Sequence, residues 1–97
     1  MRILLINPNT SVSITDRLMA SASTAASRDT ELVPVTAHRG VPYIASRIEA
    51  AIASNVVMEL LAEHSEGIDG AIIAAFGDPG LGAARELMDY PVVGLAE

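Results

Sequence analysis

Two unbroken apolar runs constrain the fold of this chain more than any other feature. Residues 3–6 read Ile-Leu-Leu-Ile and residues 70–75 read Gly-Ala-Ile-Ile-Ala-Ala, with no alternating polar positions. Strands that are buried on both faces have this pattern, and such strands are typical of parallel sheets covered by helices. The sequence therefore predicts two central strands of a parallel sheet.

Two further strands are predicted at residues 32–35 and 91–95, which are rich in Leu and Val. Pro34 has no amide hydrogen and removes one donor from the hydrogen-bond ladder between strands. The strand at residues 32–35 is therefore expected at an edge of the sheet.

Helices are expected in the three gaps between the strands, over residues 11–27, from Ser46 to about residue 63, and over residues 81–88. Ser46 and Glu49 match the capping box, in which two side chains satisfy each other's free backbone donors. The apolar residues expected to form helical stripes are Ile14, Leu18, Ala22 and Ala25 in the first helix and Ile48, Ile52, Val56 and Leu60 in the second.

The ends of these helices are less well defined by the sequence. Tyr43 and Ile44 leave room for an earlier start of the second helix, and Gly67 marks its expected end. Asp78 followed by Pro79 matches the N-cap and first turn of the third helix.

The predicted element order is βαβαβαβ within one domain that covers residues 1–97. Right-handed crossovers place such strands in one parallel sheet with helices on both faces. In the flavodoxin-like arrangement the strand order is 2-1-3-4, and the switch point lies between the first and third strands. The loops at residues 7–11 and 75–80 are then expected to face each other.

Composition excludes several classes of function. The net charge of −6 argues against nucleic acid as a partner, and the absence of cysteine excludes disulfides and thiolate metal sites. His38 and His64 are far apart in the sequence, so no metal site is expected. No apolar run approaches the ~20 residues of a membrane span, which predicts a cytoplasmic protein without a membrane partner.

The two loops have the composition of a seat for a small polar ligand. Asn7 and Asn9 carry amides that donate and accept, and Gly77 lets the backbone approach a ligand closely. Tyr43 can close over such a ligand, or it can pack at the start of a helix. The loops can equally be plain turns and caps, and Asp78 would be a weak general base if it capped a helix.

Several motifs together resemble one family. They are Ile-Asn-Pro-Asn-Thr-Ser at 6–11, Arg-Gly-Val-Pro-Tyr-Ile-Ala-Ser-Arg at 39–47, Phe-Gly-Asp-Pro-Gly-Leu at 76–81, Ala-Arg-Glu-Leu at 84–87 and Pro-Val-Val-Gly-Leu-Ala-Glu at 91–97. In this order they resemble the hydantoin racemases. These belong to the aspartate/glutamate racemase superfamily, which also includes allantoin racemases and arylmalonate decarboxylase.

The resemblance implies a reaction and a site. Members racemise 5-substituted hydantoins without a cofactor, using two cysteines on opposite faces of the substrate's α-carbon. The first cysteine corresponds to Ala75, and the second belongs to another domain that this sequence does not contain. The substrate-binding residues that the resemblance implies are Asn7, Asn9, Thr10, Tyr43, Phe76, Gly77 and Asp78.

Two interpretations follow from the resemblance. The chain is the N-terminal domain of a hydantoin racemase by ancestry, but a methyl group at position 75 cannot transfer a proton. We therefore expect the chain as given to be inactive. The alternative is a non-catalytic domain that binds a ligand or assembles with copies of itself. Apolar surface that a second domain would cover also predicts a homo-oligomer.

Overall fold

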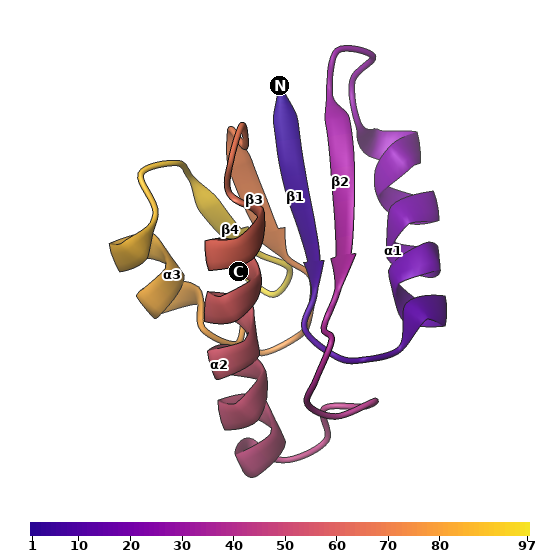
Figure 1. Cartoon of the computed structure of the whole chain (residues 1–97). Helices are drawn as coiled ribbons and strands as arrows, with labels where there is room; N and C mark the ends of the chain where they lie inside the picture. The colour runs from indigo at the N-terminus through magenta and orange to yellow at the C-terminus, as the bar shows by residue number, and fades with distance from the viewer.

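The four strands form one parallel sheet in the order β2-β1-β3-β4, as predicted. The computed structural model describes the whole chain, from Met1 to Glu97. Figure 1 shows the two central strands side by side, with β2 and β4 at the edges. The strands are β1 at Arg2–Asn7, β2 at Glu31–Thr36, β3 at Gly70–Ile73 and β4 at Val92–Gly94.

The register explains why the central strands contain no polar alternation. Ile6 of β1 is paired with Val35 of β2 on one side and with Ile73 of β3 on the other. Ile6 and Ile73 are fully buried because both faces of the sheet are covered at this level. Pro34 lies on β2, whose outer edge has no neighbouring strand, so its missing donor leaves no gap in the ladder.

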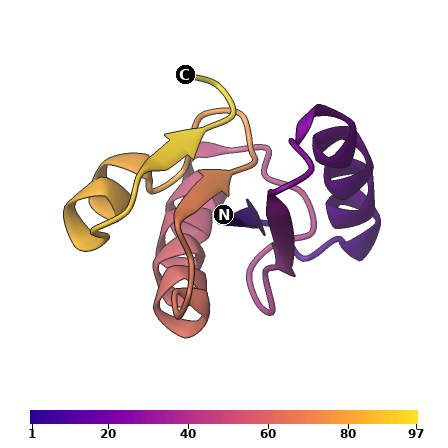
Figure 2. The ribbon, with the colours of Figure 1, turned by 90° about the horizontal axis from the view of Figure 1, so that it is seen from above.

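The helices lie on both faces of the sheet, as predicted. α1 at Val12–Ala25 packs on β1 and β2, whereas α2 at Arg47–His64 and α3 at Leu81–Leu87 cover the opposite face (Figures 1 and 2). The main core lies between the sheet and the pair α2 and α3. No helix is long and apolar enough to cross a membrane.

The serine cap of α2 is confirmed, whereas Glu49 reaches back one residue beyond the cap residue, to Ala45. The Ser46 hydroxyl accepts a hydrogen bond from the Glu49 amide at 3.2 Å, and the Glu49 carboxylate accepts one from the Ala45 amide at 2.8 Å. α2 begins at Arg47, so Tyr43 and Ile44 do not extend it upstream.

The apolar stripe predicted for α2 is correct only in its second half. Val56 and Leu60 are buried, but Ile48 is 74% exposed and Ile52 is 38% exposed. The first turns of α2 extend past the carboxyl ends of the strands (Figure 1), so the sheet does not reach their side chains. The residues of α2 that are buried are Ala53, Val56, Val57, Leu60 and Leu61.

The predicted cap of α3 is wrong. Gly80, with a φ of 77°, occupies the N-cap position, and Asp78 and Pro79 lie in the turn before it. A Cβ atom at Gly80 would lie 3.2 Å from the carbonyl oxygen of Ser54. The chain therefore passes so close to α2 that glycine is favoured at the start of α3, and the Asp78 side chain is left for another contact.

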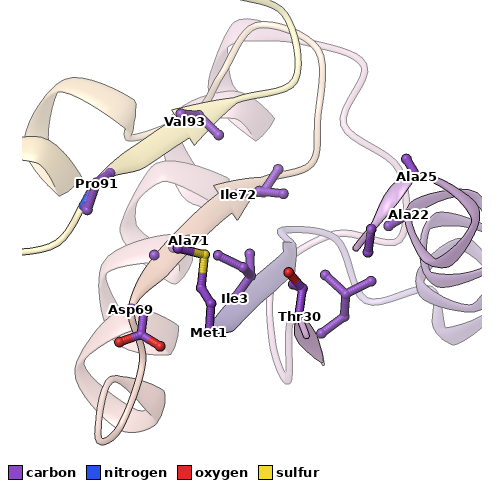
Figure 3. Close-up of a pocket in the computed structure, with 13 residues that line it drawn as sticks. Met1, Ile3, Ala22, Ala25, Thr30, Asp69, Ala71, Ile72, Pro91 and Val93 are labelled. Carbon is purple, nitrogen blue, oxygen red and sulfur yellow. The ribbon is translucent and has the colours of Figure 1, made fainter. Parts of the chain in front are cut away.

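The face of the sheet that carries α1 is only partly covered. An apolar groove of about 460 Å³ runs beside α1 over the remaining strands (Figure 3). Its floor includes Ile3, Ile72 and Val93 from three strands, and Ala22 and Ala25 of α1 form one wall. Ala25, which we predicted to face the sheet, is exposed because it borders this groove.

Candidate active site

Three loops meet at the carboxyl edge of the sheet. The Ala74 amide donates to the Ile6 carbonyl at 2.8 Å, which brings the end of β3 beside the end of β1. The Thr10 amide donates to the Val41 carbonyl at 3.0 Å, which brings in the loop after β2. The loops at residues 7–11 and 75–80 therefore leave adjacent ends of β1 and β3, as expected for the switch point, and the loop after β2 contacts the first of them.

Asn7 shapes the first loop from within. Its side chain is buried, and its Nδ2 lies 2.9 Å from Asn9 Oδ1, 3.0 Å from the Ser11 carbonyl oxygen and 2.9 Å from Thr15 Oγ1. Its Oδ1 accepts a hydrogen bond from the Asn9 amide at 3.1 Å. The donor and acceptor of the Asn7 side-chain amide are thus satisfied by partners within the protein, and these hydrogen bonds fix the path of the loop.

Asn9 and Thr10 keep polar atoms free at the edge of this loop. Asn9 Oδ1 also accepts from the Ser11 amide at 2.9 Å, whereas its Nδ2 makes no hydrogen bond within the chain. Thr10 uses its backbone amide on Val41, and its hydroxyl makes no hydrogen bond. Ser11 precedes α1 without a side-chain cap, so the first amides of α1 receive no side-chain acceptor.

The loop after β3 is a tight turn. The Asp78 amide donates to the Ala75 carbonyl at 3.2 Å, and both Gly77 and Asp78 have positive φ angles, of 87° and 48°. Phe76, inside the turn, is 83% exposed. Ala75 is half-buried where the strand meets the turn.

Asp78 connects this turn to the end of the chain. Its Oδ1 accepts a hydrogen bond from the Ala96 amide at 2.9 Å, across 18 residues of sequence. The sequence offered no signal for this contact. It follows from Gly80 beginning α3 in place of an aspartate cap.

The loop after β2 carries Tyr43 without support from other side chains. Tyr43 is 73% exposed and makes no hydrogen bond, so it does not pack at the start of α2. Arg39 binds Glu59 of α2, with its Nε 3.0 Å from Glu59 Oε1. This hydrogen bond lowers the pKa of Glu59 and raises the pKa of Arg39.

The geometry permits binding and orientation more readily than proton transfer. The loops that follow β1, β2 and β3 carry the Asn9 amide and two exposed aromatic residues, Tyr43 and Phe76. The residue between β3 and the turn is Ala75, whose methyl group has no exchangeable proton. No His, Asp or Glu cluster suited to a metal ion is present.

Comparisons with known proteins agree on one family. Residues 3–97 match the Asp/Glu/hydantoin racemase family. A hydantoin racemase from Pseudomonas sp. (strain NS671) is 42% identical over 98 residues, and one from Paenarthrobacter aurescens is 39% identical over 99 residues. These alignments cover all of this chain but only 39% and 42% of the relatives, so the chain spans about two-fifths of their length.

Two solved structures share the fold. An allantoin racemase from Klebsiella pneumoniae superposes with a TM-score of 0.92 at 46% identity, and one from Pseudomonas fluorescens with a TM-score of 0.93 at 34% identity. The superpositions cover 97% of this chain and 39% and 40% of those structures. The chain belongs to the Asp/Glu/hydantoin racemase family.

Proposed function

We propose that this chain forms one half of a racemase site and binds a 5-substituted hydantoin or a similar cyclic ureide. The observation that carries the proposal is that the 7–11 and 75–80 loops leave the adjacent ends of β1 and β3. The names of the relatives support the substrate class, since they are hydantoin and allantoin racemases.

The polar ring of such a ligand is bound by the edge of the two loops. Asn9 Nδ2 and the Thr10 hydroxyl are free donors. Gly77 has no side chain, so the ligand can approach its backbone closely. Tyr43 and Phe76 lie exposed on the same edge and flank the 5-substituent. Asn7 and Asp78 complete the proposed binding set by holding the two loops in shape.

The chemistry of the proposed racemase requires a group at position 75. In the two-cysteine mechanism one thiolate removes the α-proton while a thiol on the opposite face delivers another, without a cofactor. Backbone donors at the loops stabilise the negative charge that develops on the carbonyl oxygen. With Ala75 in that position, the chain binds the substrate and does not racemise it.

A titration tests the binding proposal. We expect 5-methylhydantoin to shift the backbone amide resonances of residues 7–11 and 75–80 selectively. Phe76→Ala is expected to weaken binding, whereas Leu87→Ala, at an equally apolar exposed position on α3, is the matched control. Shifts confined to other parts of the chain, or no shifts at millimolar ligand, would refute the proposal.

We further propose that the chain self-associates. The apolar groove beside α1 exposes Ile72 and Val93 to solvent on an otherwise covered sheet. Contiguous apolar surface of this kind is typical of an interface. A second copy covers it in the absence of any other chain. A binding or self-assembling domain without catalysis remains the second candidate function, favoured by Ala75.

A further inference from the structure

We propose that Asp78 is a positioning residue whose carboxylate fixes the 75–80 turn to the segment that follows β4. Asp78 Oδ1 accepts a hydrogen bond from the Ala96 amide at 2.9 Å. Asp78 is also the only residue other than glycine with a positive φ. Aspartate adopts this backbone conformation more readily than most residues, but it still needs support from its surroundings.

Gly94 provides the space that this carboxylate occupies. A Cβ atom at Gly94 would lie 2.3 Å from both Cγ and Oδ1 of Asp78 and 2.8 Å from Oδ2. No real Cβ contact is that short, so any side chain at position 94 would displace the carboxylate. Asp78 and Gly94 are therefore matched to each other across 16 positions of sequence.

The segment that receives Asp78 is itself fixed. Glu97 accepts a hydrogen bond from the Gly94 amide at 3.2 Å and forms an ion pair with Arg85 at 2.5 Å. Arg85 in turn donates from Nε to the Val92 carbonyl at 2.9 Å. These contacts fix the segment after β4 to α3 and β4, so the partner of the Asp78 carboxylate is held in place.

The first half of the turn has few other attachments, whereas Pro79 is buried and Gly80 packs closely on α2. Phe76 is exposed, and a Cβ atom at Gly77 would meet nothing within 4 Å. The Asp78 amide donates a hydrogen bond to the Ala75 carbonyl, and the Asp78 carbonyl accepts one from the Leu81 amide. The Asp78 side chain adds a third attachment, to the Ala96 amide. The carboxylate therefore sets where the backbone of Phe76 and Gly77 points.

The consequence for ligand binding rests on the proposed function. If residues 75–80 bind a hydantoin, a turn that is already ordered loses less entropy on binding than a loose one. Removing the Asp78 carboxylate then weakens binding without removing a ligand contact. Asp78→Asn keeps an Oδ1 acceptor for Ala96, so it retains most of the effect.

A double-mutant cycle tests the match between Asp78 and Gly94 without any ligand. Gly94→Ala is expected to lower the urea midpoint strongly in the presence of Asp78, and much less in the Asp78→Ala background, where the clashing atoms are gone. If Gly94→Ala folds only when Asp78 is also replaced by alanine, this outcome supports the proposal as well. Equal losses in both backgrounds overturn the proposal.

Amide exchange tests the hydrogen bond even if no Gly94 variant folds. The Ala96 amide is expected to exchange about tenfold faster in Asp78→Ala, the effect of losing one hydrogen bond to a charged group. It should exchange at nearly the original rate in Asp78→Asn. An Ala96 exchange rate that is the same in all three proteins overturns the proposal.

Titration with 5-methylhydantoin separates this proposal from the proposed function. We expect weaker binding by Asp78→Ala and rescue by Asp78→Asn. Loss of binding by Asp78→Asn with a protected Ala96 amide would instead show that the charge contacts the ligand, and it would overturn the positioning role. If the unaltered chain does not bind hydantoin but the cycle shows coupling, the proposed function fails and the Asp78 contact stands.

Discussion

At the scale of single residues, Asn7 and Ala75 decide what the edge of the sheet can do. Asn7 is a buried polar side chain whose hydrogen-bonding groups are satisfied by the loop and by α1. Ala75 follows the end of β3, where a side chain reaches the start of the turn. One residue determines the shape of the candidate site, and the other determines its chemistry.

Replacing Asn7 with alanine is expected to destabilise the fold by about 2 kcal/mol, because Thr15 and the Asn9 amide lose buried partners. Urea denaturation measures the loss. Asn55→Ala is the control, since Asn55 is exposed and makes a single contact with Arg39, and surface changes of this kind stay within about 0.5 kcal/mol. Equal losses for both variants would show that the Asn7 network contributes little.

Ala75→Cys introduces a thiol at the position where the family resemblance implies the first cysteine. We expect it to accelerate deuterium exchange at C5 of a bound hydantoin in D₂O without full two-base racemisation. The rate should rise with pH toward the ordinary thiol pKa of about 8.5, since the thiolate is the base. NMR follows the exchange, and Ala75→Ser is the matched control because its hydroxyl stays protonated.

Exchange that is no faster in Ala75→Cys than in Ala75→Ser, in folded and hydantoin-bound protein, would contradict the assignment of position 75.

At the scale of elements, each loop of the site is fixed by the element next to it. The first loop is bound to α1 through Asn7 and Thr15, and Thr15 also contacts Thr36 of β2 at 2.6 Å. The loop after β2 is held at one end by the hydrogen bond of Arg39 to Glu59 of α2 and at the other by the cap of Ser46 and Glu49. The exposed residues between these ends, including Tyr43, are the least supported part of the site.

Loss of the serine cap is expected to release the end of that loop. Ser46→Ala should reduce stability by about 1 kcal/mol, since it removes the side-chain acceptor of the Glu49 amide. Urea denaturation followed by circular dichroism at 222 nm measures this effect. Ser21→Ala, at an exposed position inside α1, should leave the midpoint unchanged or slightly higher. A loss in Ser21→Ala as large as that in Ser46→Ala would argue against a specific cap.

The ion pair of Arg39 and Glu59 predicts a pH dependence. Its hydrogen bond lowers the pKa of Glu59 in the folded state, so the unfolded state binds the proton more readily. The contribution is therefore complete above the ordinary glutamate pKa of 4.5 and is lost as the pH falls through the lowered value. Denaturation midpoints between neutral and acidic pH should fall less steeply in Glu59→Gln than in the unaltered chain.

Glu63→Gln is the control for this comparison, because Glu63 also lies near His38 but, unlike Glu59, forms no ion pair with Arg39. Identical slopes for Glu59→Gln and the unaltered chain would contradict the prediction.

At the scale of the whole molecule, helices cover one face of the sheet completely and the other face only in part. α2 and α3 cover one side with a continuous aliphatic core, whereas α1 leaves an apolar groove over β1, β3 and β4 (Figure 3). The relatives are about two and a half times as long as this chain.

Self-association through the groove is the prediction at this scale. Size-exclusion chromatography with light scattering should show a dimer or larger species at micromolar concentration. Val93→Lys places a charge in the groove and should shift the population toward monomer. Leu87→Lys places the same charge on α3, on the opposite side of the sheet, and should have no effect. A clean monomer of the unaltered chain would refute the proposal.

The sequence by itself determined the strand order, the central position of β1 and β3, the edge position of β2 and the serine cap of α2. The central strands, the edge strand and the cap follow from local patterns, because continuous apolar runs, a proline and a serine–glutamate pair each restrict the backbone where they occur. The strand order follows from the βαβαβαβ element order together with the flavodoxin-like arrangement. The position of the 7–11 and 75–80 loops at one edge of the sheet also followed, since parallel strands end at the same edge.

Only the tertiary structure decided the exposure of Ile48, the start of α3 at Gly80, and the contact of Asp78 with Ala96. Each depends on how far one element extends beyond another or on how closely two backbones approach. Such distances arise from packing between segments that are far apart in the chain, and no local pattern encodes them. Helical spacing placed Ile48 on an apolar stripe, but the length of the sheet left it in solvent.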